Sequence, residues 1–167
     1  MIEFEIKRFS LKRVGTSGLN KESQPCLAVA KPVVLLLDDD EKDLTLLEQI
    51  LRPDGFQVLK TTDPARAFEL LASHPVGIVI SDQNMPGLTG VEFLSQVRKL
   101  YPDVIRIVFT SSHDPKVFAD AVNEAGVHKF MMKDWDRERL RTEVREVSRR
   151  YRSSTATKIP PPESPAA

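Results

Sequence analysis

VGIVISDQNMPG, residues 76–87, joins a continuous apolar run to a polar turn. An unbroken apolar run is typical of a strand in a parallel sheet whose two faces are both covered. The run ends at Asp82, and a carboxylate at the mouth of a buried strand costs free energy unless a cation or a reaction uses it. The stretch therefore predicts a buried parallel strand that ends in a functional carboxylate.

Strand and helix patterns alternate along the chain on both sides of this stretch. Asp63-Pro64 and Asp114-Pro115 each place an N-cap aspartate before a proline, and Thr89-Gly90-Val91-Glu92 reads as a capping box. Gly55 and Gly126 stand where left-handed helix ends are expected. The alternation predicts the α/β class, a doubly wound five-stranded parallel sheet of order 2-1-3-4-5 (flavodoxin-like) with helices on both faces. The expected strands are 33–37, 56–60, 77–81, 104–109 and 127–132, and the expected last helix covers about 135–151.

The strand order predicts where the polar residues meet. Ligands of such sheets bind between strands 1 and 3, where the direction of winding switches. Strand 1 is followed by Asp38-Asp39-Asp40 and strand 3 by Asp82, while Thr110 and Lys133 follow strands 4 and 5. We therefore expect these side chains to converge on one rim of the sheet.

The acidic residues on this rim match the needs of magnesium. Mg²⁺ takes oxygen ligands in octahedral geometry and commonly uses one or two carboxylates, with water completing the shell. Asp39 and Asp82 are predicted to bind it directly, Asp38 to hold a coordinated water, and Asn84 to contribute its backbone carbonyl. The metal would also offset the repulsion among clustered carboxylates.

The same residues suit the transfer of a phosphoryl group onto an aspartate. Asp82 is the predicted nucleophile, which gives an acyl phosphate. Catalysis of phosphoryl transfer consists largely of positioning and charge neutralisation, for which Lys133 offers a compact cation and Thr110 a hydroxyl donor. Each feature also has an ordinary explanation: acids at a helix start, a polar turn, a capping hydroxyl and a solvated lysine. Their joint placement on one rim favours the site.

Together, these motifs resemble the receiver domain of two-component response regulators over about residues 33–150. The resemblance implies that Asp82 accepts a phosphoryl group from a histidine kinase or a histidine phosphotransfer protein. It also implies that Asp38 and Asp39 form the acidic pair for Mg²⁺ and that Thr110 and Lys133 contact the phosphoryl group. The motifs are Leu37-Asp38-Asp39-Asp40, Asp82-Gln83-Asn84-Met85-Pro86-Gly87 with Gly90, Thr110-Ser111, and Lys133.

The resemblance further implies a switch. Phe130 stands three residues before Lys133, where receivers place a switch aromatic, and it is expected to follow Thr110 when the latter moves toward the phosphoryl group. Helix 4, strand 5 and helix 5 then form a surface for an unknown target protein or for a homodimer. A narrower likeness, to receivers found with HD-type cyclic-dinucleotide phosphodiesterases or in hybrid kinases, rests on Ser81–Gly87, Asn123–Gly126 and Lys133-Asp134-Trp135.

One position departs from the family pattern, and two other functions compete. Receivers usually carry proline after the site lysine, whereas this chain has Asp134, so Lys133 is expected to be aimed differently or to pair with Asp134. This departure gives some weight to a receiver-like adaptor that works without phosphorylation. A phosphatase similar to the haloacid dehalogenases would use Asp38 as nucleophile and Asp40 as second acid, but it leaves Asp82 without a role.

Composition narrows the remaining classes of function. The 167 residues carry 24 basic and 24 acidic side chains, which gives no general case for binding nucleic acid or an anionic membrane. The single cysteine, Cys26, fits a reducing compartment, and no segment has the length and apolarity of a membrane span or a secretory signal. We expect a cytoplasmic protein. No helix-turn-helix pattern follows the receiver-like region, so no direct DNA binding is expected.

The domain organisation is predicted from changes in composition. Residues 1–31 are basic and are expected to form a flexible extension, residues 32–152 form the receiver domain, and residues 153–167 form a proline-rich disordered tail.

The last helix is rich in arginine and in acidic residues. We expect these charges to form a solvated face with i,i+4 pairs, and a partner surface is the alternative.

Overall fold

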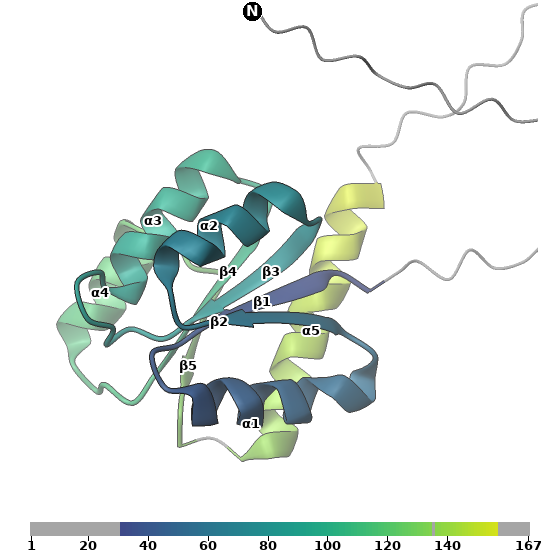
Figure 1. Ribbon diagram of the computed structural model, residues 1–167, viewed down its shortest axis with the longest axis horizontal. Helices are drawn as coiled ribbons and strands as arrows, with labels where there is room; N and C mark the ends of the chain where they lie inside the picture. The colour runs from purple at the N-terminus through teal and green to yellow at the C-terminus, as the bar shows by residue number, and fades with distance from the viewer. Residues whose placement is uncertain (1–30, 135, 157–167) are drawn as a thin grey trace, which may run out of the picture.

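The computed structural model describes residues 31–134 and 136–156. It contains a parallel five-stranded sheet of order β2-β1-β3-β4-β5, which confirms the predicted fold class (Figure 1). The predicted basic extension, apart from Lys31, and the tail beyond Ala156 lie outside the described residues. The strands are β1 (Val33–Leu37), β2 (Gln57–Thr61), β3 (Val76–Ser81), β4 (Ile105–Thr110) and β5 (Lys129–Met132).

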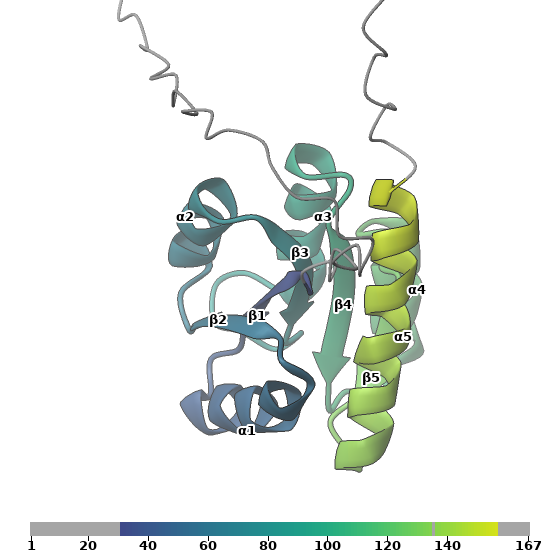
Figure 2. The same ribbon diagram turned by 90° about the vertical axis from the view of Figure 1, so that its right-hand side faces the viewer.

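Helices cover both faces of the sheet. The core on one face is built with α2, α3 and α4, and the core on the other face with α1 and α5. Figure 2 shows the strands between α1 and α2. The helices are α1 (Glu41–Leu51), α2 (Pro64–Ser73), α3 (Gly90–Leu100), α4 (Pro115–Asn123) and α5 (Arg137–Ala156), and a short 3₁₀ helix, η1 (Arg52–Asp54), follows α1. None of the helices in this part of the chain combines the length and apolarity needed to cross a membrane.

The predicted helix starts are confirmed. The side chains of Asp63 and Asp114 accept hydrogen bonds from the amides two residues further on, at 2.9 and 2.8 Å. Thr89 forms the complete capping box of α3. The last helix ends at Ala156, later than the predicted end near residue 151, because no proline or glycine interrupts the chain before Pro160.

The strands β1, β3 and β4 are buried along their whole length. Their side chains alternate between the two cores, so Leu35 and Val79 face one set of helices while Leu36 and Ile80 face the other. This two-sided burial explains the unbroken apolar runs in the sequence. In the observed register Leu37 lies opposite Ser81 and Ser81 opposite Val108, and this sets the relative positions of the polar residues that follow the strands.

Asp54 links η1 to α5 through two arginines. Its carboxylate, whose side chain is 7% exposed, accepts hydrogen bonds from Arg141 at 3.0 and 3.3 Å and from Arg145 at 2.6 Å. Burial acts to raise the pKa of Asp54, but the two guanidinium groups outweigh it and lower the pKa to about 2. The arginines of α5 are thus not all solvated, contrary to the expectation for this face.

Asp54→Asn is expected to lower the free energy of unfolding at pH 7 by about 2 kcal/mol, the value that corresponds to the lowered pKa of the carboxylate. The stabilisation is present in full above the ordinary pKa of 3.8 and is lost as the pH falls through about 2. Urea unfolding at several pH values measures the difference. Glu146→Gln, which removes an exposed pair with Arg150, serves as the control and should cost less than about 0.5 kcal/mol. An equal loss of unfolding free energy in both variants would contradict a stabilising role of the pairs between Asp54 and the two arginines.

Candidate functional site

Two backbone hydrogen bonds beyond the strands set up the rim of the sheet. The amide of Asp82 donates to the carbonyl of Leu37 at 2.8 Å, so the ladder between β1 and β3 continues to the first residue of the loop. In the same way, the amide of Lys133 donates to the carbonyl of Thr110 at 2.9 Å and continues the ladder between β4 and β5. The parallel strands thus bring Asp82 beside Asp38, and Lys133 beside Thr110.

Three carboxylates, those of Asp38, Asp39 and Asp82, form a cluster that we name the acidic trio. One oxygen from each lies within 4.8 Å of the others. Asp38 is 1% exposed and Asp82 4% exposed, while Asp39 lies at the surface. Burial raises the pKa of Asp38, although hydrogen bonds from Lys133 and from the amide of Asp40 oppose this shift. A set of oxygen ligands with unbalanced negative charge and an open side fits a hard divalent cation.

The ammonium group of Lys133 neutralises part of this charge. Its Nζ lies 2.7 Å from Asp38 Oδ2, 2.9 Å from Asp82 Oδ1 and 2.7 Å from Asp43 Oδ2. Burial acts to lower the pKa of Lys133, but its three carboxylate partners raise the pKa above its ordinary value. The bond between Lys133 and Asp134 is trans, as expected for a residue other than proline, and Lys133 nevertheless points into the site. The expected pairing with Asp134 is not among these contacts.

Asp43 was missed by the sequence analysis. It belongs to the first turn of α1, where an acidic residue is explained by the helix dipole alone. The only signal in the sequence was its position five residues after Asp38, and its contact with Lys133 spans 90 residues of chain. By contrast, Asp40 is exposed and accepts a hydrogen bond from the amide of Lys42 at 2.8 Å, so it acts as the N-cap of α1.

Thr110 and Phe130 lie on the neighbouring strands β4 and β5, and the carbonyl of Thr110 accepts a hydrogen bond from the amide of Lys133. Thr110 is fully buried, and its hydroxyl oxygen accepts a hydrogen bond from the amide of Ser112 at 3.0 Å. Phe130 is half-buried, and its ring packs edge-on against that of Phe118 in α4, with the centroids 5.3 Å apart. Phe118 is 53% exposed. The ring of Phe130 thus links β5 to the exposed Phe118 of α4.

The loop after β3 is held by hydrogen bonds to the start of α3, and the close approach of these two segments requires a glycine at position 90. The amide of Asn84 donates to Asp82 Oδ2 at 2.6 Å, and Gln83 accepts from the amides of Gly90 and Val91 at 3.1 and 3.0 Å. A Cβ atom on Gly90 would lie 2.1 Å from the carbonyl oxygen of Asp82. Gly90 therefore allows the start of α3 to pack against the backbone of Asp82.

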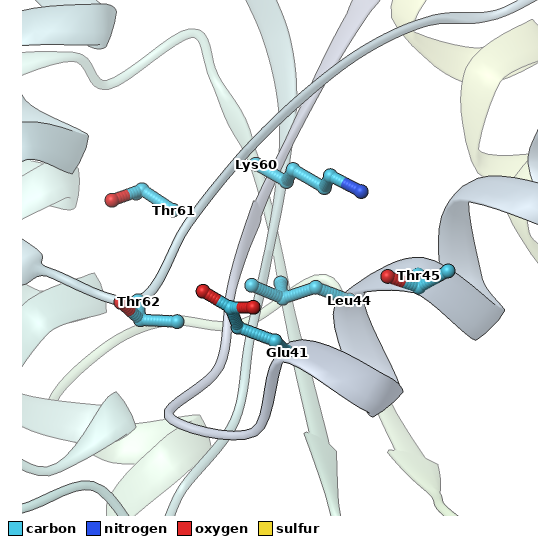
Figure 3. A pocket seen from close by; sticks show the side chains of 6 residues that line it. All are labelled: Glu41, Leu44, Thr45, Lys60, Thr61 and Thr62. Carbon is cyan, nitrogen blue, oxygen red and sulfur yellow. The ribbon is translucent and has the colours of Figure 1, made fainter.

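A separate hollow lies beside the site, between α1 and the edge strand β2. It has a volume of about 290 Å³ and is lined by Glu41, Leu44, Thr45, Lys60, Thr61 and Thr62 (Figure 3). None of its lining residues belongs to the acidic trio. Lys60 forms an ion pair with Glu48 at 2.6 Å, so its charge is already balanced. We assign no role to this hollow in the chemistry of the trio.

Residues 34–145 match the family model of the response regulator receiver domain. The hydrogenase transcriptional regulatory protein HoxA of Cupriavidus necator is 38% identical over 114 residues, which cover 68% of this chain and 23% of HoxA. The transcriptional regulatory protein PrrA of Mycobacterium tuberculosis is 36% identical, over 77% of this chain and 54% of PrrA. The chain thus spans about a quarter of the length of HoxA and about half that of PrrA.

Solved structures show the same likeness. The signal receiver domain of an HD domain-containing protein from Pseudomonas fluorescens Pf-5 is 32% identical, with a TM-score of 0.71 over 74% of this chain and 98% of that one. A CheY-like receiver domain protein from Methanospirillum hungatei shares the fold at 22% identity, with a TM-score of 0.70 over 74% of this chain and 98% of that one.

Gly90→Ala is expected to destabilise the protein by about 1–3 kcal/mol, because the added Cβ meets backbone atoms that have no free space to move into. Urea unfolding gives the loss of stability, and amide exchange at Val91 reports the hydrogen bond to Gln83. Gln96→Ala, on the exposed side of the same helix, should leave both quantities unchanged. Unaltered stability of Gly90→Ala would show that α3 does not pack this closely on the loop.

Proposed function

Because the chain belongs to the response regulator receiver domain family, we propose that its acidic trio and Lys133 serve the transfer of a phosphoryl group to Asp82. The proposal rests mainly on one observation. The buried carboxylate of Asp82 lies 2.9 Å from the ammonium of Lys133 and shares a cluster with Asp38 and Asp39. This arrangement gives a nucleophile, a cation for the phosphoryl oxygens and a set of metal ligands in one place.

The donor is a histidine kinase or a histidine phosphotransfer protein. A carboxylate oxygen of Asp82 bonds to the phosphorus, and the bond from phosphorus to the donor histidine breaks. The bonding pair stays on the imidazole nitrogen, and the product is an aspartyl phosphate. Lys133 and the hydroxyl of Thr110 stabilise the charge on the phosphoryl oxygens. Asp38, Asp39, Asp82 and the carbonyl of Asn84 would hold magnesium, which would supply the positive charge that lets a phosphate approach three carboxylates.

The two competing functions differ in which residue they need. A phosphatase would use Asp38 as nucleophile with Asp40 as acid, but Asp40 serves as the cap of α1. A phosphorylation-independent adaptor would bind its partner equally well after Asp82→Asn. The receiver family and the intact trio favour the phosphoacceptor, whose enzymatic activity is limited to phosphorylating itself from small donors and to dephosphorylating itself.

Incubation with acetyl phosphate and Mg²⁺ is expected to add the mass of one phosphoryl group to the protein. The addition should be absent from Asp82→Ala and from a sample with chelator, since both remove part of the site. Intact-mass spectrometry makes the measurement. Loss of the adduct in Asp38→Ala, with retention in Asp82→Ala, would point instead to the phosphatase; no adduct at all in the unmodified protein would favour the adaptor.

We further propose that the phosphoryl group alters the surface formed by α4, β5 and α5. The carbonyl of Thr110 accepts a hydrogen bond from the amide of Lys133, and Phe130 on the adjacent strand contacts Phe118 on α4. Phe118 and Val122 are 53% and 47% exposed, which leaves an apolar area for a target protein or for a second copy of the chain. Movement of Thr110 toward the phosphoryl group opens space into which the half-buried ring of Phe130 turns.

Beryllium fluoride, which mimics the phosphoryl group on a carboxylate, is expected to shift the backbone amide NMR signals of α4, β5 and α5 more than those of α2. The reason is that Phe130 and Phe118 join β5 to α4, whereas the aromatic contact of α2 is that of Phe68 with Phe93 in α3. Asp82→Ala, treated identically, should show no shift. Light scattering on the same samples gives the oligomeric state. Shifts confined to the loops that carry Asp38 and Asp82 would contradict this switch.

A further inference from the structure

Lys133 has one acidic partner outside the trio. Its Nζ lies 2.7 Å from Asp43 Oδ2, which is as short as its contact with Asp38 and shorter than its contact with Asp82. The side chain of Asp43 is 33% exposed, whereas those of Asp38 and Asp82 are almost fully buried. Asp43 comes from α1, so this contact joins the helix to the residue that follows β5.

The usual role of an acidic residue at this position does not account for the contact. Asp43 is the third residue of α1, from which an acidic side chain normally reaches back to the amide of the N-cap. Here the amide of the N-cap, Asp40, donates instead to Asp38 Oδ1 at 3.0 Å. The carboxylate of Asp43 is turned toward Lys133. The attraction between this carboxylate and the helix dipole does not depend on which way the side chain points. The direction of the Asp43 side chain is therefore explained by its contact with Lys133.

The three partners of Lys133 change differently when the site is used. A bound cation takes up part of the negative charge of Asp38 and Asp82, which weakens their hold on the ammonium group. Phosphorylation turns one oxygen of Asp82 into a bridging oxygen and removes the negative charge of that carboxylate. Asp43 is not a member of the trio, so it keeps its full charge in both states. Of the three carboxylates, it is therefore the one whose charge stays the same during the transfer.

The residue that follows Lys133 gives less support to the lysine than receivers usually have, so a carboxylate that holds the ammonium group matters more here. Receivers commonly have proline there, which restricts the backbone next to the lysine, and this chain has Asp134. We propose that Asp43 is a positioning residue, which holds the ammonium group of Lys133 where it meets the oxygens of the incoming phosphoryl group. This inference rests on the proposed phosphorylation of Asp82 and adds to it a charge anchor supplied by α1.

The test compares Asp43→Asn and Asp43→Glu with Glu41→Gln in the full chain. Glu41 lies in the same first turn and is exposed, so its substitution removes one charge without removing a partner of Lys133. The rate of phosphorylation is measured by intact mass at saturating Mg²⁺ over a range of acetyl phosphate concentrations. In the reaction, the bond from phosphorus to the acetyl oxygen breaks, and acetate leaves with the bonding pair as Asp82 bonds to phosphorus.

Asp43→Asn is expected to lower the maximal rate by about tenfold, with little change in the half-saturating donor concentration, since the interaction matters in the transition state. Asp43→Glu should recover part of the rate, and Glu41→Gln should match the unmodified protein. An equal or faster rate in Asp43→Asn would overturn the proposal, because it would mean that Asp43 is neutral or draws the lysine away from the phosphoryl group.

A second measurement does not depend on phosphorylation. The ¹⁵N signal of the Lys133 ammonium, assigned by its loss in Lys133→Met, is expected to remain sharp in the unmodified protein when Mg²⁺ is added. In Asp43→Asn this signal should broaden or disappear on addition of Mg²⁺, because no carboxylate with its full negative charge remains to hold the ammonium group. A signal that is equally sharp in both would overturn the anchor. If the unmodified protein took up no phosphoryl group, the proposed function would fail while this readout still decided the role of Asp43.

Discussion

The contact between the ammonium group of Lys133 and the carboxylates of Asp38 and Asp82 is the interaction on which the site depends. Two acids that are 1% and 4% exposed would repel each other if nothing offset their charge. Lys133 lies 2.7 Å from one and 2.9 Å from the other, so a single cation stabilises both. It leaves a net negative charge on the trio, and such an excess of carboxylate oxygens favours a hard divalent cation.

The sheet makes this contact possible because parallel strands end on the same side. The apolar runs of β1, β3 and β4 fill two cores, and the register that they impose brings residues 38, 82 and 110 to one edge. The backbone bonds of Asp82 to Leu37 and of Lys133 to Thr110 extend that order into the loops. The buried apolar surface therefore stabilises an arrangement of charges that would be unfavourable by itself.

The sequence predicted those features that arise from local or periodic patterns. The caps at Asp63 and Asp114 depend on residues two positions apart, and the meeting of Asp38 with Asp82 follows from the strand order alone. Contacts between distant side chains were not predictable in this way. Asp54 with Arg141 spans 87 residues and Asp43 with Lys133 spans 90, and in both cases the local sequence reads as an ordinary charged helix. Which charges meet is decided by how the helices pack on the sheet, and no local pattern encodes that.

The two ends of α4 are held by contacts of different kinds. Arg98 donates to the carbonyls of Asn123 and Glu124, and Arg106, which is 6% exposed, donates to those of Ala125 and Gly126. These charge-assisted bonds satisfy carbonyls at the C-terminal end of the helix, where cations are also favoured by the dipole. Along α4 itself, Ala121 is the buried residue, and Phe118, which is 53% exposed, packs edge-on against Phe130. The start of α4 is held instead by the N-cap Asp114, whose side chain accepts a hydrogen bond from the amide of Lys116 at 2.8 Å, so the helix is anchored at its end by charged groups from neighbouring elements and at its start by its own cap.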